Sequence, residues 1–479
     1  MTSWNEVVGA VLLGTRRRSA DLTGLPKGIR ELARRRETPA EQALVAAAVV
    51  TGYRRAGQRA HAAVHPLEPA PPDGREMVSP QARERLVRLL PANRPELLEE
   101  WLHAVAARRL RVPAEHLPAL ADAARSRVSL RVPLAEVAGA TGAWLGGHNP
   151  EWAFLASAED DTAGAWQFGT SAQRQAWFAR ALRTDPEQAR QALHGTWSTE
   201  PAELRAAFLT LLGEHLAASD EPFLETALGD RAAGVRDIAL RLSGRFPRSA
   251  VGERMAARLA GCVTVHTRTL RADVLRFTLP EPDDTLPGDG IRIPPGPSQG
   301  TARLRALIAA TPLRFWDRLG TPGELAGMLV EGVPRNPVRE GWATAALRQR
   351  DEGWAQALVE AEPGGRATAE LVGVLSPDGQ AATVAKLTRG LPIETLTRLI
   401  LDLPRPWSPQ LGRVLLGWVA EQPDHRLVAH AATLVAKAVP PACLDHPLAA
   451  VPPLGEAVPW RRTVAETLLF RREMHEELS

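Results

Sequence analysis

One histidine pair has a spacing that suits metal binding. His61 and His65 are four residues apart, so on a helix both side chains would lie on the same face. A zinc site needs at least three protein ligands, and neither a cysteine nor an H-E-x-x-H motif lies near this pair. His425 and His430 are five residues apart, which fits one helix face less well. We therefore expect no metal site at either pair.

Motifs for phosphate binding and covalent catalysis are missing from the sequence. Residues 288–300 are rich in glycine and proline, but Lys and Ser/Thr do not follow at the offsets of a phosphate-binding loop. No G-x-S-x-G string occurs, and neither Cys262 nor Cys443 stands in a recognisable nucleophile context. Asp283-Asp284 reads as a solvated acidic loop rather than a cation site. We expect no enzymatic activity and no cofactor.

The densest basic runs lie near the start of the chain. Arg16, Arg17 and Arg18 form the first run, and residues 34–36 form the second. Such runs can hold phosphates or an acidic partner. The alternative is a solvated helix end, where arginine is favourable near the negative pole of the helix dipole. Together with Trp4, the first run is our candidate interaction surface.

The composition indicates a soluble protein without a dedicated nucleic-acid surface. The 479 residues include 58 Lys and Arg against 55 Asp and Glu, a formal net charge of only +3. Nucleic-acid binders usually show a larger basic excess. Two cysteines give no disulfide framework, and no apolar run approaches the roughly 20 residues that span a bilayer. We expect a cytoplasmic protein that does not enter the membrane.

A helix pair occurs twice in nearly the same letters. Asp220-Glu221-Pro222 opens one pair, and Asp185-Pro186-Glu187 opens the preceding one, 35 residues earlier. In the second helices, Leu204-Arg205 and Val235-Arg236 correspond at an offset of 31 residues. A period in the thirties is typical of stacked helical repeats, which bury a core only against their neighbours. The sequence therefore predicts an all-α protein with an α-solenoid of helix pairs.

The turn of the second pair resembles a HEAT repeat. Asp230-Arg231 is followed six residues after the aspartate by Arg236. In HEAT repeats, an aspartate and an arginine at this spacing bond between adjacent repeats, and Arg205 recurs at the place of Arg236. Asp220 and Asp230 also stand at helix N-cap positions. We expect Asp230 and Arg236 to share one stabilising interaction; the alternative is a capped helix with a surface arginine.

The chain falls into four expected regions. Residues 1–165 read as an N-terminal helical region, residues 166–262 as HEAT-like repeats, and residues 301–479 as a C-terminal helical region. Between the last two lies an irregular Pro/Gly-rich connection at 263–300. Within it, residues 263–265 and 275–279 alternate like short strands, and a small hairpin is expected around Ile291-Arg292-Ile293.

Three strings resemble the actinobacterial and cyanobacterial family DUF5691. They read WNEVVGAVLLGTRRR from Trp4, WLGGHNPEW from Trp144 and DEPFLETALGDR from Asp220. Val11 stands where the family has alanine, and Arg16 stands where an acidic residue is common. The resemblance covers nearly the whole chain. The family has no established activity, and its members are typically encoded beside a MoxR-type AAA+ ATPase, a von Willebrand A-domain protein and a SWIM zinc-finger protein.

Two functions from different classes remain open. The first is a non-enzymatic scaffold or adaptor that binds an AAA+ ATPase and a von Willebrand A-domain protein, because stacked repeats form extended binding surfaces. The second is a nucleic-acid-binding protein that resembles the HEAT-like alkylpurine DNA glycosylases. Trp177, Arg180, Asp185 and Arg190 are the residues that such a groove would use, but the near-neutral net charge disfavours it.

Overall fold

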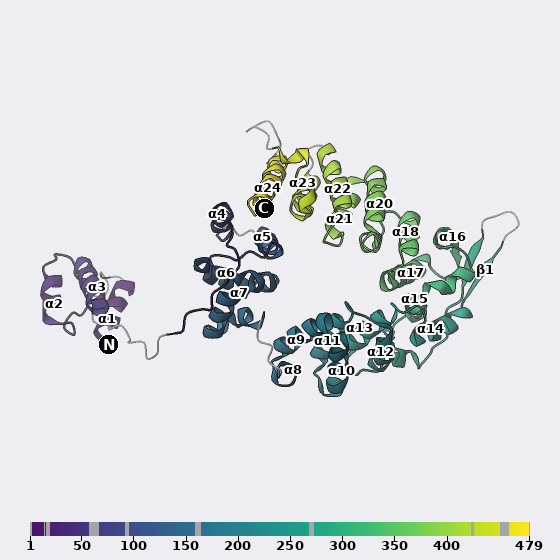
Figure 1. Ribbon diagram of the computed structural model, residues 1–479, viewed down its shortest axis with the longest axis horizontal. Coiled ribbons are helices and arrows are strands. Elements are labelled where there is room, and N and C mark those ends of the chain that lie inside the picture. Colours follow the sequence, from purple (N-terminus) through teal and green to yellow (C-terminus); the bar gives the residue numbers. More distant parts are fainter. Residues whose placement is uncertain are drawn as a thin grey trace. The chain divides into compact units, whose positions relative to one another are not determined.

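The protein is built mainly from α-helices. The computed structural model describes residues 2–13, 15, 20–56, 67–91, 95–158, 164–267, 273–422, 426–450 and 459–478. These residues form helices α1 to α24, short 3-10 helices and three short strands (Figure 1). None of the described helices is both long enough and apolar enough to cross a bilayer. The chain divides into two compact units, residues 1–69 and 70–479; the four-region organisation remains a prediction.

The first unit contains three helices: α1 (Thr2–Leu13), α2 (Lys27–Arg34) and α3 (Pro39–Ala56). Helix α3 contacts both of the others. It begins with a reciprocal cap, because Thr38 Oγ1 accepts from the Glu41 amide and Glu41 accepts from the Thr38 amide. A small core holds the three helices together: Val7, Leu22, Leu25, Ile29, Ala33, Ala46 and Val50.

The second unit opens with a four-helix block that has its own core. Its helices are α4 (Pro80–Leu89), α5 (Pro95–Ala107), α6 (Leu117–Ser126) and α7 (Arg131–His148), with 3-10 helices at Ala114–His116, Val128–Leu130 and Pro150–Ala158. Ser79 caps α4 by accepting from the Ala82 amide, and Pro80 occupies the first turn, where no amide partner is needed. Trp101, Leu86, Leu102 and Leu134 are fully buried at the centre of the block.

Helix pairs follow from residue 165 onward. The helices are α8 (Ala165–Phe168), α9 (Ser171–Thr184), α10 (Pro186–Thr196), α11 (Ala202–Leu212), α12 (Glu221–Leu228), α13 (Ala233–Ser243) and α14 (Ala250–Ala260). Helix α9 contacts α10 and α11, and α13 contacts α11, α12 and α14. Helices α9, α11 and α13 therefore pack in a row, each against the next, while α10 packs on α9 and α12 packs on α13. Phe178 and Phe208, 5.1 Å apart between ring centroids, join α9 to α11 in the core.

A three-stranded sheet interrupts the helices. Its strands are β1 (Val263–His266), β2 (Val274–Phe277) and β3 (Leu329–Glu331), in the order β1-β2-β3. Strands β1 and β2 are antiparallel, with Val263 opposite Phe277, and β2 and β3 are parallel, with Val274 opposite Leu329. Strands were expected close to the positions of β1 and β2; β3 was not foreseen.

The predicted hairpin around Ile291-Arg292-Ile293 is wrong. Residues 291–294 have no regular secondary structure. Gly290 turns the chain with a left-handed φ of 79°, and Ile291 is buried against the helical core. Pro294 and Pro295 then lack the amide protons that a second strand would need. The segment is held by side-chain burial rather than by strand pairing.

The remaining helices continue the same arrangement. They are α15 (Gln299–Ala310), α16 (Pro322–Gly327), α17 (Arg335–Gln349), α18 (Glu352–Ala361), α19 (Thr368–Val372), α20 (Pro377–Gly390), α21 (Ile393–Asp402), α22 (Pro409–Glu421), α23 (Arg426–Ala438) and α24 (Pro459–Glu476). Thr321, Ser376 and Ser408 cap α16, α20 and α22, each directly before a proline. Several contacts again join a helix to the helix two positions further on, as in α17–α19, α19–α21 and α21–α23.

The last helix belongs to two cores. Trp460, Val464 and Leu468 of α24 lie in the large core with the helix pairs. Further along the same helix and just beyond its end, Met474 and Leu478 are buried in the core of the α4–α7 block. Figure 1 shows α24 beside α23, with α4 and α5 close by. The end of the chain is therefore part of the block that opens the second unit.

Two arginine clusters fix α24 to that block. Arg471 is 3% exposed, and it donates from Nε and Nη2 to the carboxylate of Glu100 on α5 at 2.7 and 2.8 Å. His475 Nε2 lies 2.8 Å from the same carboxylate. Arg85 on α4 donates from Nε to Glu477 at 2.5 Å and from Nη2 to Glu473 at 3.1 Å. These charged groups join residues almost 400 positions apart in the sequence.

Replacing Glu100 should weaken the attachment of α24. Burial alone would raise the pKa of Glu100, but hydrogen bonds from His475 and Arg471 outweigh it and lower the pKa. The stabilisation is therefore present above the unfolded pKa, about 4.3, and is lost as the pH falls through the lower folded pKa. Glu100→Gln should lower the free energy of unfolding at pH 7 by about 2–4 kcal/mol.

Glu96→Gln is the matched control for this measurement by urea denaturation. Glu96 lies one turn earlier on α5, is 61% exposed and stands 3.9 Å from Lys437, so its loss should cost less than about 0.5 kcal/mol. Stability of the wild type should also fall more steeply on acidification than that of Glu100→Gln. Equal losses for the two variants would contradict a stabilising role of the buried cluster.

Candidate functional site

The best-defined polar site in the helix pairs is the ion pair between Arg205 and Asp230. Arg205 lies on α11, and Asp230 lies in the turn before α13 of the next pair. Arg205 Nη2 donates to Asp230 Oδ1 at 2.9 Å, and Nε stands 2.7 Å from Oδ2. The same carboxylate accepts from the Ala232 amide at 2.8 Å. Asp230 thus binds the preceding helix pair and caps its own turn at the same time.

The predicted partner of Asp230 is wrong in one respect. Arg236 does not bind the carboxylate of Asp230; its Nη1 donates to the backbone carbonyls of Asp230 and Arg231 at 2.6 and 2.8 Å. The reason is geometric, because Arg236 lies in the first turn of α13, directly over its own turn, whereas Arg205 approaches the carboxylate from the neighbouring pair. The side chain of Arg231 is exposed.

The electrostatics of Asp230 favour its charged form. Burial alone would raise its pKa, but the hydrogen bonds from Arg205 and from the Ala232 amide outweigh burial and lower the pKa. Both partners are well buried, since Arg205 is 8% exposed. A charge-assisted hydrogen bond of this kind is stronger than one between neutral groups.

The same contact occurs one pair earlier. Arg174 on α9 donates from Nη1 to Glu200 Oε2 at 2.8 Å, and Glu200 is buried before α11. Arg205 also donates to the backbone carbonyl of Glu200, as Arg236 does to that of Asp230. Arginines at 174, 205 and 236 are each 31 residues apart, which is the period found in the sequence. Extending that period backward by one step would have found Arg174.

The first helices of the pairs have their own arginine–carboxylate contact. Arg190 on α10 donates to both carboxylate oxygens of Asp220, at 2.7 and 3.1 Å. Asp220 is fully buried and also accepts from the Ala217 amide at 2.7 Å. The hydrogen bond with Asp220 is the main cause that raises the pKa of Arg190. Asp220 was expected as a helix cap; its arginine partner was not.

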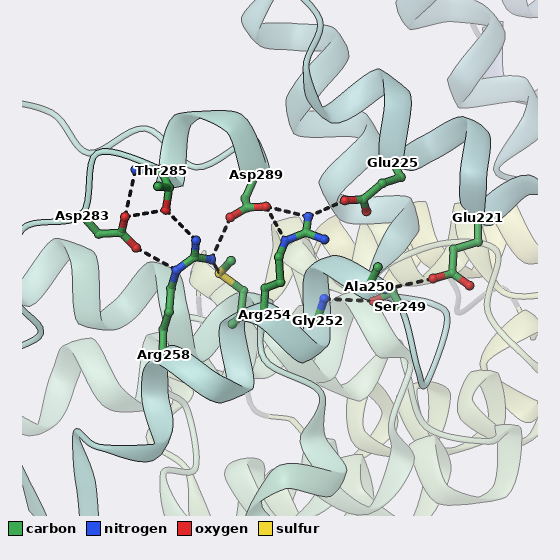
Figure 2. Close-up of polar contacts among 11 residues, drawn as sticks. Glu221, Glu225, Ser249, Ala250, Gly252, Arg254, Arg258, Asp283, Thr285 and Asp289 are labelled. Carbon is green, nitrogen blue, oxygen red and sulfur yellow. Dashed lines mark hydrogen bonds and ion pairs between the residues drawn. The ribbon is translucent and has the colours of Figure 1, made fainter.

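A larger polar cluster lies between α14 and the loop before α15. Asp289, 5% exposed, accepts from Arg254 Nε at 2.7 Å and from Arg258 Nη1 at 2.7 Å (Figure 2). Arg254 also binds Glu225 of α12. Burial alone would lower the pKa of Arg254, but Asp289 and Glu225 raise it. One buried carboxylate therefore joins α14 to the loop, and Arg254 extends the contact to α12.

The outer side of this cluster holds the loop itself. Arg258 Nη2 donates to Thr285 Oγ1, and its Nε stands 2.7 Å from Asp283 Oδ2. Hydrogen bonds from Thr285, first from its side chain and then from its amide, lower the pKa of Asp283. Figure 2 shows the acids alternating with the two arginines along the cluster. Both oxygens of Asp289 already accept hydrogen bonds from arginines, so the cluster stabilises the packing of the loop on α14.

The described residues contain no group of three or more His, Cys, Asp or Glu side chains that could hold a metal ion. His61, His65 and His425 lie outside the described residues. Cys262 and Cys443 are buried, and burial raises the pKa of both thiols. A raised pKa keeps a thiol protonated and unreactive at neutral pH.

Most of the candidate interaction residues are outside the part of the chain that the structure describes. Arg16, Arg17 and Arg18 are outside the described residues, and Trp4 is placed on α1 without a described side chain. The adjoining end of α1 is informative, however, because its apolar side chains are exposed. Leu12 is 81% exposed, and its neighbours Val11 and Leu13 are also exposed.

Residues expected in a glycosylase-like groove are engaged elsewhere. Asp185 caps α10 by accepting from the Gln188 amide at 3.0 Å, and Arg190 is bound to Asp220. The ring of Trp177 packs 5.1 Å from that of Trp166. Their contacts are those of a helical core and its caps.

The fold places the chain in the class of mostly α-helical proteins, with one small three-stranded sheet among the described residues. The chain belongs to DUF5691, a family of unknown function, which it matches over residues 6–478. The family resemblance seen in three sequence strings is thereby confirmed. No curated protein and no solved structure matches the chain.

A double-mutant cycle should assign the partner of Asp230. Asp230→Ala combined with Arg205→Met should cost less than the sum of the single variants, with a coupling of about 1–3 kcal/mol, because both remove one contact. Asp230→Ala combined with Arg236→Met should be additive within about 0.5 kcal/mol, since Arg236 binds backbone carbonyls. Urea unfolding of all five variants measures both couplings. Coupling confined to Arg236 would contradict the geometry described above.

Removing the charge of Asp289 should loosen the loop before α15. In Asp289→Asn the amide cannot accept from Arg254 and Arg258 as the carboxylate does, and the loss should lower the local opening free energy by about 1–3 kcal/mol. Hydrogen exchange of the amides at 283–291 reports this opening. Asp284→Asn is the control, because Asp284 is exposed beside the cluster. Unchanged exchange in Asp289→Asn would show that apolar burial alone holds the loop.

Proposed function

We propose that the protein is a non-enzymatic scaffold built on an α-solenoid of HEAT-like helix pairs. The observation that carries this proposal is the recurring contact between consecutive pairs. Helices pack on the helix two positions further along, and Arg174–Glu200 and Arg205–Asp230 repeat one contact at the sequence period. Arrays of this kind offer long surfaces for other proteins. A cytoplasmic location fits two unpaired, buried cysteines.

The partners proposed are a MoxR-type AAA+ ATPase and a von Willebrand A-domain protein. Support for these partners comes from the family resemblance, since such proteins are typically encoded beside the family. The buried arginine–carboxylate contacts join helices to one another, which suits a protein that binds rather than reacts. Nucleic-acid binding is the less favoured alternative, because Asp185 and Arg190 already serve the helical core.

The first unit is the proposed docking surface for a protein partner. Residues 1–69 contain 11 Lys and Arg against 6 Asp and Glu, so this unit is basic although the whole chain is near neutral. Exposed leucines at 12, 13 and 44 add apolar area to the same unit. Apolar side chains with basic residues nearby suit an acidic protein surface that has an apolar centre.

Polar substitution at the end of α1 should weaken partner binding without affecting folding. The double variant Leu12→Ser, Leu13→Ser should bind the purified ATPase or A-domain protein at least about tenfold more weakly, because two anchoring side chains are lost. Its melting temperature should stay unchanged, since both side chains are exposed. Surface plasmon resonance on the full chain measures the affinity.

Val128→Ser, Val132→Ser is the matched control. Both valines are 69% exposed and lie in the second unit, so their loss should leave binding unchanged. Equal weakening in the two double variants would move the docking surface away from α1. Absence of binding to either purified protein would overturn the proposed partners.

A further inference from the structure

Four arginines lie together where α13 and α17 end: Arg241, Arg245, Arg348 and Arg350. The two helix ends touch, because a side chain added at Gly244 would begin 3.4 Å from the Cβ of Arg348. The charges also act on one another. Burial and then the charge of Arg350 lower the pKa of Arg245, and burial together with Arg241 lowers the pKa of Arg348.

Acidic side chains balance these charges only in part. Arg245 donates to the carbonyl of Gly213, and Arg348 Nη1 donates to that of Ala309 at 3.2 Å. Both carbonyls lie at helix C-termini. The negative end of each helix dipole therefore accepts a hydrogen bond from one N–H of each arginine. Exposed Asp237 balances part of the charge, because it raises the pKa of Arg348 by more than Arg241 lowers it. In the part of the chain that the structure describes, no ion pair joins any of the four arginines to a carboxylate.

This arrangement differs from that of four other buried or half-buried arginines, although Arg236 likewise donates to backbone carbonyls. Arg190, Arg205, Arg258 and Arg471 are each bound to a carboxylate. Desolvating an arginine beside other arginines is unfavourable unless an anion compensates for it. An external anion could therefore compensate for charges in this cluster that no described ion pair balances.

We propose that the ends of α13 and α17 form a binding site for a compact, multiply charged phosphate group. Guanidinium groups match phosphate oxygens with paired N–H donors, and several of them at one point suit a group with more than one negative charge. A nucleic-acid backbone is disfavoured, because its charges are spread along a line and would need a basic stripe. The site lies in the second unit and does not depend on the proposed scaffold role.

Two of the arginines can be replaced without disturbing the fold. Arg241 is exposed on α13. Arg350 has a left-handed φ of 53°, a conformation that asparagine adopts more readily than arginine does. Arg241→Gln, Arg350→Asn therefore removes two charges from the site while Arg245 and Arg348 keep their helix-end contacts. Arg389→Gln, Arg413→Gln removes two charges from exposed positions on α20 and α22 and serves as the control.

Isothermal titration calorimetry with tripolyphosphate and with ATP tests the site on the full chain. Tripolyphosphate should bind the wild type at one site, and the Arg241→Gln, Arg350→Asn variant should bind it at least about tenfold more weakly. The control variant should bind within about twofold of the wild type, since screened distant charges contribute little. Equal affinity for ATP and tripolyphosphate would assign recognition to the phosphates alone, and tighter ATP binding would identify a nucleotide as the source of the phosphate.

Three results would overturn the proposal. One is no binding of either phosphate compound to a folded wild-type chain. Another is equal weakening in the control variant, which would mean that overall charge attracts the anion. The third is binding of a glutamate-rich peptide, but not of tripolyphosphate, because the site would then recognise an acidic protein segment.

Discussion

The interaction on which the second unit most depends is the buried contact between an arginine and a carboxylate of successive helices. Apolar packing between helices is strong but not directional, so a helix pair could slide or rotate over its neighbour at small cost. Arg205 restrains that freedom, because its Nη2 donates to Asp230 Oδ1 at 2.9 Å while its Nε lies 2.7 Å from Oδ2. Arg190 with Asp220, and Arg471 with Glu100, apply the same constraint elsewhere. The ion pairs therefore restrict how neighbouring helices are positioned, and the burial of apolar surface holds the helices together.

The helical class and the family could be predicted from the sequence, because helix signals and family motifs are short patterns of neighbouring residues. The cap of α10 by Asp185 could be predicted for the same reason, because the acceptor and its amide are close in sequence. Asp230 was expected as an N-cap, but Ala232 holds that position in α13 and Asp230 accepts from its amide. The partner of Asp230 could not be assigned, since Arg205 and Arg236 occupy equivalent repeat positions and only the packing of neighbouring pairs distinguishes them. Strand β3 and the contacts of α24 could not be predicted from the sequence either, because both join segments that are far apart in the chain.

The candidate sites show a similar division. Asp289 stands in a loop without a motif, and its importance follows only from the approach of Arg254 and Arg258 across α14. The arginines at the ends of α13 and α17 are more than 100 residues apart in sequence and look like ordinary helix-terminal arginines. Arg254 and Arg258 are each bound to the carboxylate of Asp289, whereas the arginines at the ends of α13 and α17 take part in no described ion pair. Only the folded structure shows this difference.

The placement of α24 also has a consequence for synthesis on the ribosome. Met474 and Leu478 are part of the core of the α4–α7 block, yet they follow the block's own residues by more than 300 positions in the sequence. At ordinary rates of about 5–20 residues per second, the block must wait roughly 15–60 s after its own residues emerge before this part of its core is filled. During that interval its apolar gap is open to water and to other nascent chains. A cell that makes this protein therefore has to protect an early segment until a late one arrives.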